Sequence, residues 1–262
     1  MSVPAFRFAP SPNGELHLGH AYSALLNERM AREAGGRFLI RIEDIDTIRC
    51  TAELARRALD DLAWLGLAWE QPVRIQSEHF ADYLMQQERL ARMGLLYPCF
   101  CSRKDIADAR RDPEGQPVYP GTCRALARAE IESRIASREP HAMRIDMEAA
   151  VARTAVSAAL AWGDVVLARK DIGTSYHMAV VTDDHAQGIT HVVRGRDLEA
   201  ATAIHLLLQR LSGFASPHYH HHGLVGDDMG RKLSKSDGAK SLRALRAEGR
   251  TARDIRRMLG FG

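Results

Sequence analysis

Two histidines three residues apart, His17 and His20, stand within the stretch PSPNGELHLGH at residues 10–20. This stretch follows a short apolar run and precedes an amphipathic segment, which is the order strand, Pro/Gly-rich turn, helix. A helix N-terminus directs unpaired N–H groups outward, and Gly14 and Gly19 let a ligand come close to the backbone. The pattern predicts a phosphate site in which both imidazoles supply donors for charge that develops during a reaction.

A cationic loop with the sequence GRKLSKS lies far downstream, at residues 230–236. Its lysines, Lys232 and Lys235, are mobile point charges, and a loop of this kind can close over a polyphosphate. On its own, a loop rich in lysine and serine is more typical of a solvated turn. Paired with HLGH at the front of the chain, it predicts one triphosphate held by two distant segments.

Three of the four cysteines lie close together in the sequence, as Cys99, Cys101 and Cys123. Because no secretory signal is evident, this clustering favours a metal over a disulfide framework. Three thiolates and one further donor suit tetrahedral zinc in a structural role. The chemistry alone leaves the fourth donor open between Tyr119, a water and a nearby acid, and reduced buried thiols are the alternative to any metal.

Hydrophobic periodicity predicts the elements that position the histidines. Strands are expected over 6–9 and 37–44, and helices over 21–34, 51–65 and 78–93. A strand–helix–strand–helix order with a Gly/Pro-rich first turn favours an α/β fold with a doubly wound, Rossmann-like parallel sheet.

The pattern breaks near residue 95 and returns near residue 171. A helix is predicted over 124–137; further along, strands over 176–181 and 189–194, a helix over 197–211 and an extended run over 218–225. We therefore expect the first half of a nucleotide-binding domain at 1–94, a zinc-bearing insertion at 95–170 that splits the sheet, the second half with the KLSKS loop at 171–240, and a short helical C-terminal stub at 241–262.

The composition is that of a globular protein, with 45% hydrophobic and 26% charged residues. No run approaches the ~18 apolar residues of a membrane span, so we expect a cytoplasmic protein. The net charge of +3 permits an RNA partner without requiring one. Nothing in the sequence predicts an obligate interface, and a monomer is expected.

HLGH and KLSKS resemble the HIGH and KMSKS signatures of the class I aminoacyl-tRNA synthetases. RFAPSP at residues 7–12, RIED at 41–44, and the run from DDH at 183–185 to RG at 194–195 resemble the glutamyl branch of that family. Glutamyl-tRNA synthetases continue into a helical domain that reads the anticodon, whereas this sequence stops soon after KLSKS. In this, and in its cysteines, it resembles the glutamyl-Q tRNA(Asp) synthetases.

The resemblance implies an enzyme that activates L-glutamate with ATP and Mg²⁺ to glutamyl-adenylate. The glutamate would then pass to the queuosine base at the wobble position, in the anticodon stem-loop of tRNA(Asp). Two rival functions remain: a shortened glutamyl-tRNA synthetase that charges the tRNA 3′ end, and an idle paralogue that serves as an RNA-binding module. A zinc protein with incidental similarity would not explain motifs spread over most of the chain.

The resemblance also implies a role for particular residues. The residues matching glutamate-binding positions are Arg7, Ser11, Glu43, Tyr176 and Arg194. Those matching ATP-binding positions are His17, Gly19, His20, Lys232 and Lys235, of which His17, His20 and Lys235 would be catalytic. Those matching zinc ligands are Cys99, Cys101, Tyr119 and Cys123.

Charge chemistry supports glutamate independently, because this substrate carries two carboxylates and one ammonium. Arg7 and Arg194 can each hold a carboxylate through two parallel N–H contacts, and Glu43 suits the ammonium. The alternative is a structural ion pair between Arg7 and Glu43.

Three further groups of residues have no place among the predicted catalytic, binding or zinc residues. Cys50 stands where the resemblance leads us to expect arginine, and we expect a small buried residue or a surface thiol there. The histidines at 218, 220 and 222 share one face of an extended segment, but we expect no functional metal. DDH at 183–185 is expected to form a strand-end turn that shapes the ATP ribose pocket.

Phosphates of the RNA are expected to contact basic residues of the insertion and the tail, such as Arg103, Arg124 and Arg256.

Overall fold

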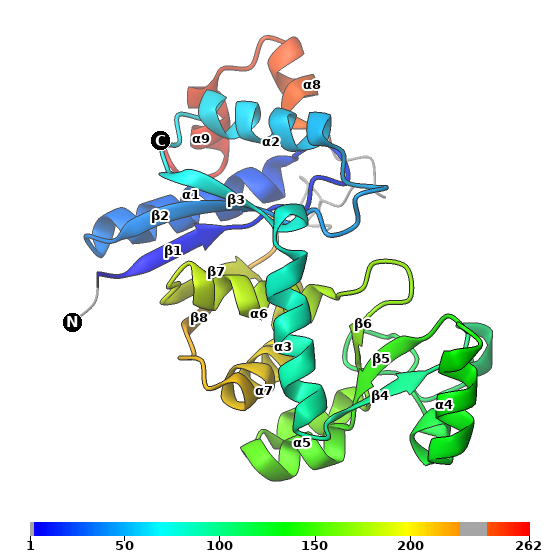
Figure 1. Cartoon of the computed structure of the whole chain (residues 1–262). Helices are drawn as coiled ribbons and strands as arrows, with labels where there is room; N and C mark the ends of the chain where they lie inside the picture. Colours follow the sequence, from blue (N-terminus) through cyan, green and yellow to red (C-terminus); the bar gives the residue numbers. More distant parts are fainter. Residues whose placement is uncertain (1–2, 226–239) are drawn as a thin grey trace. The chain divides into compact units, whose positions relative to one another are not determined.

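The computed structural model describes residues 3–225 and 240–262, which form two compact units (Figure 1). The first unit comprises Met1–Glu78, Gly188–Glu199 and Pro217–Gly262, and the second comprises His79–Gln187 and Ala200–Ser216. No helix within the described residues is long and apolar enough to cross a membrane.

A five-stranded parallel sheet forms the centre of the first unit. Its strands are β1 (Ala5–Phe8), β2 (Arg37–Ile42), β3 (Glu70–Ile75), β7 (His191–Gly195) and β8 (His218–His222), in the order β3-β2-β1-β7-β8. The chain runs outward from β1 to β3 and then resumes on the other side of β1 with β7. The strand order therefore reverses between β1 and β7, and ligands of such sheets bind at the carboxyl ends of the strands at this switch point.

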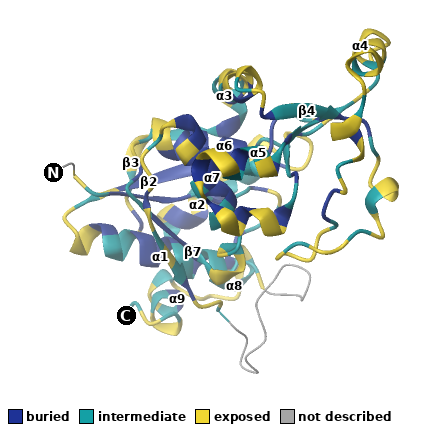
Figure 2. Ribbon diagram, turned by 90° about the horizontal axis from the view of Figure 1, so that it is seen from below, coloured by how far each residue is buried: buried dark blue, intermediate teal, exposed yellow. Residues whose placement is uncertain are grey.

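The two faces of this sheet carry different side chains. Phe6 of β1, Ile40 of β2 and Val193 of β7 belong to a core that also contains apolar residues of the four helices α1 (Leu18–Glu33), α2 (Ala52–Trp64), α8 (Leu242–Ala247) and α9 (Ala252–Met258). Figure 2 shows β2 and β7 largely in the colour of buried residues. The amide of Asn27 on α1 donates to the Val193 carbonyl at 2.9 Å, which joins the helix to the sheet. The short 3₁₀ turns η1 (Gln76–Glu78) and η5 (Arg196–Leu198) complete this unit.

The second unit combines a small antiparallel sheet with helices. The sheet has the order β4-β5-β6, with β4 (Leu96–Cys99), β5 (Ala142–Ile145) and β6 (Val166–Ala168). The helices are α3 (Phe80–Arg92), α4 (Arg128–Ala136), α5 (Met147–Thr154), α6 (Tyr176–Ala186) and α7 (Thr202–Ser212), with the 3₁₀ turns η2 (Lys104–Ile106), η3 (Thr122–Ala125) and η4 (Ser157–Trp162). Helices α3, α6 and α7 pack on one another, whereas α4 has no buried residue (Figure 2).

The α/β fold with its parallel sheet is confirmed, and so are the strands expected near 6–9, 37–44, 189–194 and 218–225. The strand expected over 176–181 is wrong, because this segment opens α6. Ser175 caps the helix by accepting a hydrogen bond from the Met178 N–H, and the following apolar run is buried throughout. An apolar run buried on all sides has the same pattern in a helix as in a strand.

The expected strand-end turn at 183–185 is also wrong, because these residues lie within α6. Asp183 is fully buried and accepts the Tyr83 hydroxyl at 3.0 Å, and the His185 ring stacks on Phe214 at 3.7 Å. They therefore tie α6 to its neighbours in the second unit. That unit contains the expected insertion together with α3, α6 and α7. The expected domain boundaries at residues 94, 170 and 240 stay predictions.

Candidate functional site

The two histidines of HLGH form the N-terminal cap of α1. His17 is the cap residue, and its Nδ1 accepts the Gly19 N–H at 3.1 Å. In return, Nδ1 of His20 accepts the His17 N–H at 3.1 Å, so the two side chains form a reciprocal capping box. Their rings lie 3.9 Å apart between centroids. The sequence pattern thus places both imidazoles at the helix end that favours anions.

The capping box also decides which ring nitrogen carries the proton. Because Nδ1 of each ring accepts a backbone N–H, the neutral imidazoles of His17 and His20 carry their proton on Nε2. Both rings are then hydrogen-bond donors through Nε2. At Gly19 an added Cβ would lie only 3.0 Å from Cε1 of His17, so a larger residue there would push the His17 ring from its place over the helix start.

The chain that follows the lysine loop returns to the first histidine. Ser241 forms an antiparallel bridge with His17, and the Leu242 N–H donates to the Leu16 carbonyl at 2.7 Å. Lys232 and Lys235 themselves lie outside the described residues, so their place beside the histidines stays a prediction. The described residues that follow the lysines, Ser241 and Leu242, do pair with the chain at the start of HLGH.

Two buried arginines lie on strands that flank the switch point. Arg7 on β1 is 4% exposed and Arg194 on β7 is 5% exposed. Phe6 pairs with His191 in the parallel register, so alternation places Arg7 and Arg194 on the same face, opposite the Phe6 core. Two guanidiniums on one face at this edge suit a ligand that carries two carboxylates.

Glu43 follows β2 at the same edge of the sheet. Its carboxylate accepts Nη2 of the fully buried Arg41 at 3.1 Å, and its backbone N–H donates to the Pro10 carbonyl at 3.0 Å. Sequence reasoning did not single out Arg41. The signal available in the sequence was an arginine between two isoleucines, Ile40 and Ile42, in an expected strand. In the structure both isoleucines belong to the core.

Cys50 is the small buried residue that was expected as one of two alternatives. Its Sγ lies 3.6 Å from the Ser11 hydroxyl and 4.0 Å from the Glu43 carbonyl oxygen. Burial raises the pKa of the Cys50 thiol, and the Ser11 contact opposes this shift. The thiol therefore links two residues of the predicted glutamate site as a neutral group.

Tyr176 belongs to the second unit, where it is the first residue of α6. Its ring lies 5.4 Å from that of His177 and 5.5 Å from that of His205, between centroids. His177 and His205 are themselves joined by a contact of 3.3 Å between Nδ1 and Nε2. These rings fix Tyr176 within its own unit, and its part in a glutamate site stays a prediction.

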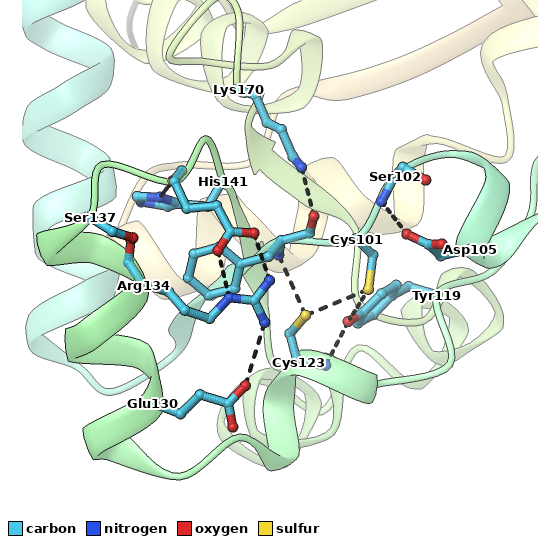
Figure 3. Close-up of polar contacts among 12 residues, drawn as sticks. Cys101, Ser102, Asp105, Tyr119, Cys123, Glu130, Arg134, Ser137, His141 and Lys170 are labelled. Carbon is cyan, nitrogen blue, oxygen red and sulfur yellow. Dashed lines mark hydrogen bonds and ion pairs between the residues drawn. The ribbon is translucent and has the colours of Figure 1, made fainter.

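The cysteines of the second unit form a compact cluster at the end of β4 (Figure 3). The sulfurs of Cys99, Cys101 and Cys123 all lie within 4.8 Å of one another. The Tyr119 hydroxyl lies 3.5 Å from the Cys101 sulfur and accepts the Cys123 N–H at 2.6 Å. Zinc bonds to sulfur of about 2.3 Å require sulfurs about 3.8 Å apart in a tetrahedron, so the three thiols fit this metal.

The acidities within the cluster differ. Burial tends to raise the pKa of Cys123, but hydrogen bonds from the Tyr119 hydroxyl and the Phe100 N–H bring it below the ordinary thiol value. Burial raises the pKa of Cys101, and it raises that of Tyr119 further, together with the neighbouring sulfurs. The phenol is therefore protonated in the absence of a metal, and the assignment of Tyr119 as fourth ligand stays a prediction.

The histidine-rich strand β8 presents alternate residues to opposite faces. His222 is buried, with its ring 5.1 Å from that of Tyr22, and its Nδ1 lies 2.8 Å from the Gly223 carbonyl oxygen. Burial lowers the pKa of His222, so it is a neutral residue of the sheet.

The family described as tRNA synthetases class I (E and Q), catalytic domain, matches residues 5–260 of the chain. A glutamyl-Q tRNA(Asp) synthetase of Rhodobacter capsulatus is 48% identical, over 97% of this chain and 99% of the relative. A protein with the same name from Symbiobacterium thermophilum is 40% identical, over 93% of this chain and 81% of the relative. A glutamate–tRNA ligase 2 of a Methylobacterium species is also 40% identical, over 94% of this chain but 57% of its own length.

Solved structures support the same family. The glutamate-tRNA synthetase of Elizabethkingia anophelis superimposes with a TM-score of 0.75 and 26% identity, over 90% of this chain and 53% of that one. The chain thus spans about half the length of that synthetase. These matches agree with HLGH at a helix cap beside a parallel-sheet switch point. The chain therefore belongs to the class I tRNA synthetases (E and Q), catalytic domain, and is a class I aminoacyl-tRNA synthetase-like ligase.

Proposed function

We propose that the chain activates L-glutamate with ATP to glutamyl-adenylate and transfers the glutamate to the queuosine base of tRNA(Asp), acting as a monomer in the cytoplasm. The observation that carries the activation step is the pair of buried guanidiniums, Arg7 and Arg194, on one face at the switch point of the sheet. The target base rests on similarity to relatives named glutamyl-Q tRNA(Asp) synthetase.

In the first step, a carboxylate oxygen of glutamate attacks the α-phosphorus of ATP, and pyrophosphate departs in line. Such a step needs positioning and neutralisation of charge, and no protein nucleophile. Nε2–H of His17 and of His20 donate to the phosphate oxygens, and Lys235 follows the β- and γ-phosphates. Mg²⁺ enters with ATP and shares this neutralisation.

The arginines and the acid at the sheet edge select the amino acid. Arg7 and Arg194 each bind one carboxylate, and Glu43 binds the ammonium, with its own orientation set by Arg41. Ser11, supported by Cys50, lies beside these groups. The role of Tyr176 in glutamate binding stays a prediction. An uncharged side chain in place of the glutamate carboxylate leaves one buried guanidinium without its partner, which is costly.

The cysteine cluster holds a structural zinc through Cys99, Cys101, Cys123 and Tyr119 in this proposal. The three sulfurs are already close enough to bind it, and zinc binding would release the protons of the thiols and the phenol. The metal would supply folding free energy to a segment with few apolar residues and would take no part in the reaction.

RNA would bind through the C-terminal helices of the first unit. Residues 240–262 hold seven of the 36 Lys and Arg residues but two of the 33 Asp and Glu residues, which leaves 29 basic and 31 acidic residues for the rest. Glu248 is bound to Lys240, and Asp254 caps α9 through Thr251. Both acids are thus occupied, while Arg250, Arg253 and Arg257 are exposed.

Arg124 no longer belongs among the proposed RNA contacts. Its guanidinium lies 3.3 Å from Asp146, 3.5 Å from Asp164 and 3.6 Å from Glu148. A phosphate there would compete with three carboxylates, so the expectation for Arg124 is replaced by a structural role. Arg256 is half-buried on α9 and remains among the proposed contacts, and so does the exposed Arg103.

The activation step is tested by glutamate-dependent exchange between ATP and pyrophosphate without RNA. We expect exchange with L-glutamate and none above background with L-glutamine. Lys235→Ala should reduce the exchange rate far more than it weakens glutamate binding, because the lysine contacts ATP. Exchange at the parent rate in this variant would contradict its role.

The transfer step is tested with labelled glutamate and tRNA pools that contain or lack queuosine. Label on queuosine-containing tRNA that survives removal of the terminal CCA supports the proposal. Label that is lost with the CCA would favour the second candidate, charging of the 3′ end, which the similarity to glutamate–tRNA ligase 2 supports.

The RNA surface has its own test. Replacing Arg250, Arg253 and Arg257 with Ala should leave exchange intact but weaken RNA binding. The plot of log affinity against log salt should become shallower by about 2–3, because each lost phosphate contact removes ~0.7–0.9 from its slope. Arg56, engaged by Glu53 and Asp60 on α2, offers the matched control for loss of one exposed charge.

A further inference from the structure

Arg194 is held by two rings from the neighbouring strand. In the parallel register of β7 and β8, Arg194 lies opposite His221, and Val192 lies opposite Tyr219. Nε of Arg194 donates to Nε2 of His221 at 3.4 Å, and the guanidinium carbon lies 5.3 Å from the centroid of the Tyr219 ring. The two rings are nearly parallel, at an interplanar angle of 9°.

We propose that His221 is a positioning residue for glutamate recognition: its neutral ring accepts the Nε–H of Arg194 and directs the two Nη groups toward the substrate carboxylate. This inference rests on the proposed function, because it assigns Arg194 to glutamate. Tyr219 supports the same arrangement with its ring face.

The geometry gives the imidazole a defined chemical state. An acceptor at Nε2 requires the tautomer with its proton on Nδ1, which is the reverse of the tautomer in His17 and His20. A guanidinium has five N–H donors in a fixed plane, and use of Nε by a protein group leaves the Nη edge to form two parallel bonds to a carboxylate.

The surroundings keep the ring neutral. Burial lowers the pKa of His221, and Arg194 lowers it further, as do His220 and His222 on the same strand, while Glu199 opposes the shift. At neutral pH the acceptor is therefore present. Protonation would remove the acceptor and set a second cation against Arg194 in a half-buried place, so glutamate binding should weaken as the pH falls below the ordinary histidine range.

The closing experiment compares His221→Ala and His221→Gln with the parent in the glutamate-dependent exchange assay. For Ala, we expect the KM for glutamate to rise about 10-fold or more, as befits loss of a hydrogen bond to a charged group. The KM for ATP should stay within about 2-fold. Gln retains a carbonyl oxygen as acceptor and should restore the KM for glutamate to within about 3-fold of the parent.

A pH profile separates positioning from a structural role. In the parent the KM for glutamate should rise from pH 7.5 to pH 5.5, and in His221→Gln this rise should be absent, because the amide does not titrate. His220→Ala is the matched control, since His220 is an exposed neighbour on the opposite face of β8 and should leave both KM values unchanged.

Two results overturn the inference. One is a KM for glutamate in His221→Ala within about 2-fold of the parent, and the other is a parallel rise in the KM values for glutamate and ATP. Neither result touches the proposed function. A parent enzyme with no glutamate-dependent exchange would instead overturn the proposed function itself.

Discussion

The arginine face of the parallel sheet and the cysteine cluster of the second unit hold their polar groups by different means. Arg7 and Arg194 extend from strands whose other face is part of a core with 19 buried apolar residues among those the structure describes. The buried members of the cysteine cluster are Cys99, Phe100, Tyr119 and Cys123, so most of that local core consists of the predicted ligands themselves.

This difference shows how much each region depends on a ligand. The strands place the arginines whether or not a substrate is present, because the hydrophobic core fixes the sheet. Around the cysteines, the chain from 100 to 126 has only short 3₁₀ turns, and charged residues such as Lys170 and Arg134 surround Phe100 (Figure 3). A metal would there replace the missing apolar core.

The largest effect is expected at the proposed zinc site. Cys123→Ala should abolish zinc binding and make residues 100–126 a preferred site of limited proteolysis, because the local core loses its central ligand. Metal analysis and mapping of the cleavage sites measure both. A parent protein that contains less than ~0.3 zinc per chain, purified without chelator, would contradict the metal site.

A cavity in the large core should affect the first unit as a whole. Leu62 on α2 is fully buried, and Leu62→Ala should lower the free energy of unfolding by about 2–5 kcal/mol. Denaturant titration measures the loss. The zinc content should not change, and a proportional loss of zinc would show that the two regions are not independent in this respect.

Removal of one guanidinium should affect function with little effect on the fold. Arg194→Ala should raise the KM for glutamate by about 30–100-fold, which corresponds to about 2–3 kcal/mol for the loss of one partner of a buried charge pair. The exchange assay measures it, with ATP as the internal control. An unchanged KM would mean that Arg194 does not bind the substrate.

A smaller effect is expected from a buried acid on α2. Burial raises the pKa of Asp61 to about 6, against the opposing charges of Arg243 and Arg246. The folded state therefore binds the proton more tightly than the unfolded state, so this carboxyl lowers stability as the pH rises from about 4 to about 6. Asp61→Asn should stabilise the protein by about 1–2 kcal/mol at pH 7.5, below the ~3 kcal/mol of the full shift.

The pH series provides the control for Asp61→Asn. At pH 4 the parent carboxyl is already protonated in the folded state, so the stability difference between variant and parent should be much smaller. A difference that does not change with pH would show that packing, and not the charge, is responsible.

Much of the first unit was predictable because its signals are local. The Gly/Pro-rich turn and the periodicity after it predicted a helix that begins beside the two histidines, and alternation predicted β2. The reciprocal capping by the two imidazoles was not predicted. The same alternation hid Arg41, since it suggested an exposed face where the strand is in fact covered on both. Burial of a polar residue within a parallel sheet can be recognised only once the elements that pack on each face of the sheet are known.

The second unit was harder to predict because its pattern is not local. The run at the start of α6 is apolar on every side, and periodicity alone does not distinguish a buried helix from a buried strand. Nor does the sequence show that α3, α6 and α7 pack together, since that depends on tertiary contacts. The cysteine spacing, by contrast, predicted that the three sulfurs lie close together, because thiols that bind one metal ion must converge.

Ser241 performs two tasks at once. Its backbone forms a bridge with His17, and its hydroxyl caps α8 by accepting the Ala244 N–H. Ser241 thus connects His17, the N-cap residue of α1, with the start of α8. Ser241→Ala would therefore remove the cap of α8 and keep the bridge, because the Leu242 N–H still donates to the Leu16 carbonyl.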